Sequence, residues 1–147
     1  MLDLLQFLKF STDSTHAAPP GRASKLEPVI LIADDEPNIV RSIAFILQNE
    51  GLSFDVAQDG DEALDKARRH RPKLLFLDIM MPKLSGFDVC ARIREDPGLS
   101  ETHIIMLTAK GQEEDKARSL AAGANEYISK PFSPKQVLER VRAILGP

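Results

Sequence analysis

The chain has 147 residues, of which 43% are hydrophobic, and this composition suggests a single domain with enough apolar residues for a buried core. The net charge of -3 gives no reason to expect binding to nucleic acid or to a membrane surface, and no apolar run is long enough to span a bilayer. The single cysteine, Cys90, excludes an internal disulfide framework and suits the reducing cytoplasm.

Residues 1–27 precede the first predicted strand. Met1 to Phe10 is rich in Leu and Phe and could form a short helix, and Ser11 to Gly21 has the composition of a flexible linker. A helix of ten residues is marginal alone in water. We therefore expect a docking element that gains order only against a partner protein, a second copy or a groove on the domain at 28–147. The alternatives are a disordered tail and a misassigned start codon.

The first half of the domain alternates strand and helix. The apolar run Val29 to Ala33 is typical of a strand buried on both faces of a parallel sheet. Pro37 to Asn49 carries apolar residues at helical spacing, with proline at the first helical position. Phe54 to Ala57 is a short strand, and Asp61 can cap a helix that continues to about His70.

The second half repeats this alternation. Leu74 to Leu77 is an unbroken apolar run that ends in Asp78, and it predicts the central strand. A helix, a strand, a helix, a strand and a helix capped by Ser133 are expected at 87–95, 103–107, 113–122, 127–129 and 134–145. Five strands that alternate with five helices indicate an α/β domain with a parallel sheet, helices on both faces and right-handed crossovers.

Carboxylates follow two of these strands. Asp34, Asp35 and Glu36 come after the first strand, and Asp78 ends the central one. If the two strands are neighbours, the acids converge on one sheet edge, where like charges raise one another's pKa. A divalent cation would relieve this repulsion, and an all-oxygen donor set suits Mg²⁺. The plainer interpretation, in which each acid caps the next helix, accounts for Glu36 but not for the cluster.

Two other strand ends add a hydroxyl and an ammonium. Thr108 follows the run from His103 to Leu107, and Lys130 with Pro131 follows Tyr127 to Ser129. Acids after the first and third strands, a hydroxyl after the fourth and a Lys-Pro pair after the fifth form an ordered set. This set resembles the receiver domain of two-component response regulators, of the single-domain type like chemotaxis regulators, over roughly residues 29–145.

The resemblance implies a flavodoxin-like, doubly wound five-stranded sheet in the order 2-1-3-4-5 with five helices. It also implies that Asp78 is the phosphoacceptor. Mg²⁺ would be held directly by Asp35 and Asp78, by Asp34 through water, and by the backbone carbonyl of Met80.

The remaining site roles also follow from the resemblance. Lys130 would pair with one phosphoryl oxygen, and Thr108 would hydrogen-bond another. Thr108 and Tyr127, the only tyrosine in the chain, would form the switch. The peptide bond between Lys130 and Pro131 is expected to be cis.

The function implied is that of a phosphorylation-switched response regulator in a two-component phosphorelay. A histidine kinase or a histidine phosphotransfer protein would donate the phosphoryl group, and output would pass to a downstream protein by contact. We expect a cytoplasmic protein that is not an enzyme, binds no nucleic acid, carries no output domain in this chain, and is a monomer or a weak phosphorylation-dependent dimer.

Three other interpretations fit the sequence less well. A haloacid-dehalogenase-type phosphatase would need a second acid two residues after its nucleophile, where this chain has Met80. In a flavodoxin-type FMN binder, the acids at 34–36 would repel the FMN phosphate, and no Gly-rich loop follows the first strand. A degenerate receiver that works as a constitutive binding module would lack part of the acid set.

Overall fold

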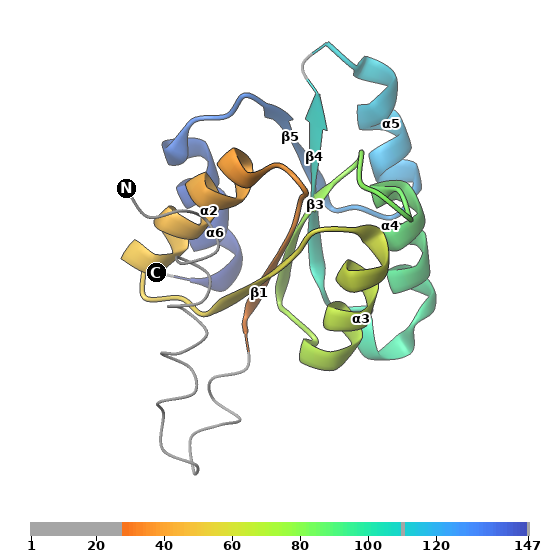
Figure 1. Cartoon of the computed structure of the whole chain (residues 1–147), viewed down its shortest axis with the longest axis horizontal. Helices are drawn as coiled ribbons and strands as arrows, with labels where there is room; N and C mark the ends of the chain where they lie inside the picture. The colour runs from red at the N-terminus through yellow and green to blue at the C-terminus, as the bar shows by residue number, and fades with distance from the viewer. Residues whose placement is uncertain (1–27, 110, 147) are drawn as a thin grey trace.

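The predicted central strand, β3 (Leu74–Asp78), lies in the middle of a five-stranded parallel sheet (Figure 1). The sheet order is β2-β1-β3-β4-β5, so the predicted fold class and strand order are confirmed. The structure is a computed structural model, and it describes residues 28–109 and 111–146. All five residues of β3 are buried, as expected for an apolar strand covered on both faces.

Helices cover both faces of this sheet, with α2 and α6 on one face and α3, α4 and α5 on the other (Figure 1). The 3₁₀ turn η2 was not predicted, because one turn is too short to show a periodicity. The bounds of the elements besides β3 are β1 Ile30–Ala33, α2 Pro37–Asn49, β2 Phe54–Ala57, α3 Gly60–His70, α4 Gly86–Glu95, η2 Pro97–Leu99, β4 His103–Ala109, α5 Glu113–Ala121, β5 Glu126–Lys130 and α6 Pro134–Leu145.

The two faces of the sheet form separate apolar cores. In β1, Ile30 and Ile32 pack in the core under α2 and α6, whereas Leu31 and Ala33 pack in the core under α3 and α4. This division follows from the alternation of side chains along a strand. Burying one Leu or Ile side chain contributes about 1.5–3 kcal/mol, so the two cores hold the strands in a fixed register.

The start of α3 differs from the prediction. Asp59, not Asp61, caps the helix, and its Oδ1 accepts a hydrogen bond from the Glu62 N–H at 2.8 Å. Gly60 is therefore the first helical residue rather than part of a turn. A Cβ at this position would lie 2.3 Å from the Leu84 carbonyl oxygen, so glycine allows the helix to pack closely against the loop after β3.

The predicted docking element at Met1–Phe10 and the linker after it lie outside the described residues. None of the helices within residues 28–109 and 111–146 has the length and hydrophobicity of a transmembrane span.

Candidate functional site

Three carboxylates meet where β1 and β3 end. The two strands are parallel neighbours with Ala33 in register with Leu77, so Asp34 lies next to Asp78. One oxygen each of Asp34, Asp35 and Asp78 lies within 4.8 Å of the other two. Asp34 and Asp78 are buried, whereas Asp35 is exposed. The structure thus brings together the acids that the sequence placed at one sheet edge.

Among the described residues, Lys130, at the end of β5, is the cation that faces this cluster. Its Nζ donates hydrogen bonds to Asp78 Oδ1 at 3.2 Å and to Glu36 Oε1 at 2.7 Å. The same Nζ lies 3.0 Å from Asp34 Oδ2, but without the alignment of a hydrogen bond, so this buried oxygen is paired only electrostatically. One ammonium cannot neutralise all of these carboxylates, and the site keeps a surplus of negative charge.

Glu36 has a different role from the one that the plainer interpretation gave it. It occupies the N-cap position of α2, but its side chain accepts no capping hydrogen bond. Its backbone N–H donates to Asp34 Oδ1 at 2.8 Å, and its carboxylate binds Lys130 instead. Sequence reasoning missed this ion pair, although the third acid in the run at 34–36 was a signal for it.

Burial dominates the electrostatics of the two inner acids. It raises the pKa of Asp78 to about 6, with a further increase from the charge of Asp34, while Lys130 acts in the opposite direction. Burial also raises the pKa of Asp34, against the hydrogen bond from the Glu36 N–H and the ammonium of Lys130. For Lys130 itself, contacts with Glu36 and Asp34 outweigh burial and raise the pKa. The carboxylates therefore resist joint ionisation, as the sequence predicted.

The loop after β3 folds back over the end of that strand. The Gly86 N–H donates to the Ile79 carbonyl oxygen at 2.8 Å, and a Cβ on Gly86 would lie 2.3 Å from the Asp78 carbonyl oxygen. Only glycine fits this close approach, a requirement that the sequence did not reveal. A cleft of about 310 Å³ lies between Asp35 and this loop. Met80, which lines the cleft, is 77% exposed.

The predicted switch residues lie on β4 and β5. Thr108 is buried near the end of β4, in register with Ser129, and its Oγ1 donates to Ser129 Oγ at 3.3 Å. Tyr127 is partly exposed on the edge strand β5, with the Lys116 Nζ 5.5 Å from its ring centroid. The peptide bond between Lys130 and Pro131 is cis, as predicted.

The donor set at this edge fits a small divalent cation. It offers three carboxylates that surround one point, a surplus of negative charge, and a buried Asp34 oxygen that accepts no hydrogen bond. Oxygen donors of this kind suit Mg²⁺, which takes one or two carboxylates directly and keeps several waters. The site is therefore a candidate magnesium centre.

A doubly wound sheet with acids, a hydroxyl and a lysine at its carboxyl edge defines a receiver-type α/β domain. The family model of the response regulator receiver domain matches residues 30–142. The chain belongs to this family.

The curated relatives are longer proteins. Alkaline phosphatase synthesis transcriptional regulatory protein PhoP of Bacillus subtilis is 46% identical over 116 residues, which cover 79% of this chain and 48% of PhoP. DNA-binding response regulator MtrA of Mycolicibacterium smegmatis is 42% identical over 116 residues, which cover 79% of this chain and 50% of MtrA. The chain thus spans about half the length of these relatives.

Solved structures with the same fold include chemotaxis response regulator CheY4 of Vibrio cholerae. It is 32% identical, with a TM-score of 0.73, and the match covers 78% of this chain and 96% of CheY4. The receiver domain of sensor histidine kinase PA1611 from Pseudomonas aeruginosa is 29% identical, with a TM-score of 0.73, and the match covers 80% of this chain and 97% of that domain. The PA1611 structure has a magnesium ion coordinated in the active site cleft.

Proposed function

We propose that this chain is a phosphorylation-switched response regulator that accepts a phosphoryl group on Asp78 from a histidine kinase or a histidine phosphotransfer protein. One observation carries the proposal. Asp78 ends the central strand within the cluster of three carboxylates, and its Oδ1 lies 3.2 Å from the Lys130 ammonium. A nucleophilic carboxylate beside a cation and a candidate magnesium centre is the arrangement that phosphoryl transfer requires.

The transfer step is a displacement at phosphorus. A carboxylate oxygen of Asp78 forms a P–O bond while the P–N bond to the donor imidazole breaks, and the imidazole keeps the electron pair and takes up a proton. The product is an acyl phosphate. A pKa of about 6 leaves Asp78 mostly ionised at neutral pH, and therefore competent to attack. Lys130 would pair with one phosphoryl oxygen, and the Thr108 hydroxyl would donate to another.

The metal would be held at the same edge. Asp35 and Asp78 would bind Mg²⁺ directly, Asp34 would bind through water, and the Met80 backbone carbonyl would add a further oxygen. When bound, Mg²⁺ would neutralise the charge that develops on the transferring phosphoryl oxygens. The surplus negative charge of the cluster supports this assignment.

The output would be a change in protein contacts. Contact between Thr108 and the phosphoryl group would draw this side chain toward Asp78, and Tyr127 on the adjacent strand would respond. A downstream protein would then bind the altered face, and the chain would act as a monomer or a weak phosphorylation-dependent dimer. In this proposal, residues 28–147 form the receiver and residues 1–27 an extension, and the protein signals in the cytoplasm rather than acting as an enzyme or binding nucleic acid.

The test uses a small phosphodonor. The purified chain is incubated with acetyl phosphate and MgCl₂, and its intact mass is measured. We expect the mass of one added phosphoryl group, lost in Asp78→Asn and kept in Asp88→Asn, which removes an exposed acid of α4 outside the cluster. Equal labelling of Asp78→Asn and the unchanged chain would refute the assignment.

A further inference from the structure

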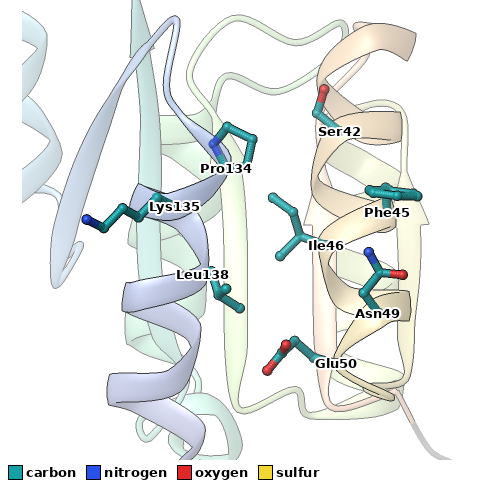
Figure 2. A pocket seen from close by; sticks show the side chains of 8 residues that line it. All are labelled: Ser42, Phe45, Ile46, Asn49, Glu50, Pro134, Lys135 and Leu138. Carbon is teal, nitrogen blue, oxygen red and sulfur yellow. The ribbon is translucent and has the colours of Figure 1, made fainter.

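A groove runs between α2 and α6, and none of its lining residues belongs to the acid cluster (Figure 2). It has a volume of about 430 Å³, and its lining includes Phe45, Ile46, Asn49, Glu50, Pro134 and Leu138. The side chains of Ile46 and Leu138 point toward one another across it (Figure 2). The helices therefore leave an apolar depression between them.

The chemistry of the groove calls for an apolar occupant. Phe45 is 60% exposed although it belongs to a helix whose other large apolar residues are mostly buried. The carboxylate of Glu50, at one end of the groove, is already paired with Arg142 at 3.2 Å. A single exposed aromatic side chain is ordinary on a protein surface, but one beside an apolar depression is typical of a docking site.

The N-terminal part of the chain enters the fold beside this groove. The Val29 N–H donates to Ser53 Oγ at 3.1 Å, and the Ile30 N–H donates to the Ser53 carbonyl oxygen at 3.3 Å. Ser53 follows Glu50 by three residues, so their Cα atoms are at most about 11 Å apart. The segment before Val29 therefore starts at the Glu50 end of the groove.

We infer that Met1–Phe10 of the same chain packs into the α2–α6 groove. This segment carries six large apolar side chains besides Met1, namely Leu2, Leu4, Leu5, Phe7, Leu8 and Phe10. As a helix it would be about 15 Å long and would present Leu4, Leu5 and Leu8 on one face. The stretch of α2 that borders the groove, Ser42 to Asn49, is about 12 Å long.

The tether is long enough for intramolecular docking. Residues 11–27 separate the segment from the domain, and a chain of that length with a linker-like composition has a root-mean-square span of about 21–25 Å. A tether of this kind gives an effective concentration on the order of mM, so even weak apolar packing would be populated. The docked segment would cover Phe45 and exclude other proteins from this face.

The test places a nitroxide at the start of the tether in the full chain. Cys90 is replaced in Cys90→Ala, and Ser11→Cys supplies the only thiol for labelling. In ¹⁵N-labelled protein we expect the backbone amide signals of Phe45, Asn49 and Leu138 to broaden, and that of Leu120, on α5 at the opposite face, to stay sharp. Leu5→Asp with Leu8→Asp, introduced together, should abolish the broadening.

A second measurement avoids the cysteine change. In the ¹⁵N-labelled full chain without a spin label, the amide chemical shifts of the groove residues should differ from those of the Leu5→Asp, Leu8→Asp variant. Phe45→Asp should release the segment in the same way. The matched control, Leu120→Asp, alters another exposed apolar residue and should have no effect. If the groove amides still broaden in the Leu5→Asp, Leu8→Asp variant, the inference is wrong. It is also wrong if they do not broaden in the chain with the unchanged segment. Broadening seen only when spin-labelled and ¹⁵N-labelled chains are mixed would show instead that a second copy donates the segment.

Discussion

Removing the charge of Asp78, in Asp78→Asn, should stabilise the domain when no metal is present. Asp78 is 5% exposed, and burial together with the charge of Asp34 raises its pKa to about 6. A raised pKa means that the folded state disfavours the ionised carboxylate, so ionisation at neutral pH destabilises the fold. Asp78→Asn keeps the shape and removes the charge, while Lys130 keeps Glu36 and Asp34 as partners.

The size of the effect follows from the pKa. The difference between about 6 and the ordinary value of 3.8 corresponds, at about 1.36 kcal/mol per pH unit, to about 3 kcal/mol. Below the ordinary pKa, the carboxyl group of Asp78 is protonated in both the folded and the unfolded chain, and the domain keeps its full stability. This stability is lost as the pH rises through about 6. We therefore expect Asp78→Asn to gain about 3 kcal/mol at about pH 7.5 and only about 1 kcal/mol at about pH 4.5.

The assay is urea unfolding in a metal-free buffer at both pH values. Asp55→Asn is the matched control, because burial opposes ionisation of Asp55 but its contacts with the Val56 N–H and Lys66 outweigh burial and lower its pKa. That variant should lose stability at neutral pH. If Asp78→Asn is less stable than the unchanged chain at about pH 7.5, or gains equally at both pH values, the account of the acid cluster is wrong.

Three other perturbations test further parts of the structure. The Arg140 guanidinium holds the pKa of Glu126 low against the effect of burial, so Glu126→Gln should lose stability at neutral pH, and the loss should shrink as the pH falls below about 4.3. Gly86→Ala should destabilise the domain by about 1–3 kcal/mol in thermal unfolding, because its Cβ would clash with the Asp78 carbonyl oxygen. Lys130→Ala should lower the rate of labelling by acetyl phosphate at least about tenfold, because a charge partner of the phosphoryl group is lost.

Each of these changes has a control or a contrary outcome. A loss in Glu126→Gln that does not depend on pH would argue against a charge effect. Gly98→Ala places its Cβ at an ordinary 3.4 Å from the nearest atom and should be tolerated, so an equal loss there would refute the steric reason for Gly86. Lys135→Ala removes an exposed lysine of α6 and should leave labelling unchanged, and a loss of labelling equal to that of Lys130→Ala would point to a nonspecific charge effect.

The strands and the acids that follow them could be predicted because their signals are local, whereas the order that makes β1 and β3 neighbours was predicted from the family resemblance. β1 and β3 are short unbroken apolar runs, which are typical of strands covered on both faces, and each run ends directly in its acids. Once the two strands are neighbours, Asp34 and Asp78 must meet. The cap of α3 was misplaced by two residues because the pair Asp59–Gly60 also fits a turn, and only the packing against Leu84 decides between them.

The features that were not predicted depend on contacts distant in sequence. Glu36 and Lys130 are 94 residues apart, and nothing near either residue shows that they pair. The steric need for glycine at position 86 arises from the Asp78 carbonyl oxygen, which the loop approaches only after folding. The α2–α6 groove is likewise a product of helix packing, because Phe45 and Leu138 belong to opposite ends of the domain sequence.

Asp78 alone is expected to carry the phosphoryl group. The most direct measurement reduces the acetyl phosphate-treated chain with borohydride, which converts an aspartyl phosphate to homoserine, and locates the change by peptide mass spectrometry. We expect homoserine at position 78 and unmodified aspartates at positions 34 and 35. Homoserine at either of those two positions, or phosphate retained on a Ser or Thr side chain after reduction, would contradict it.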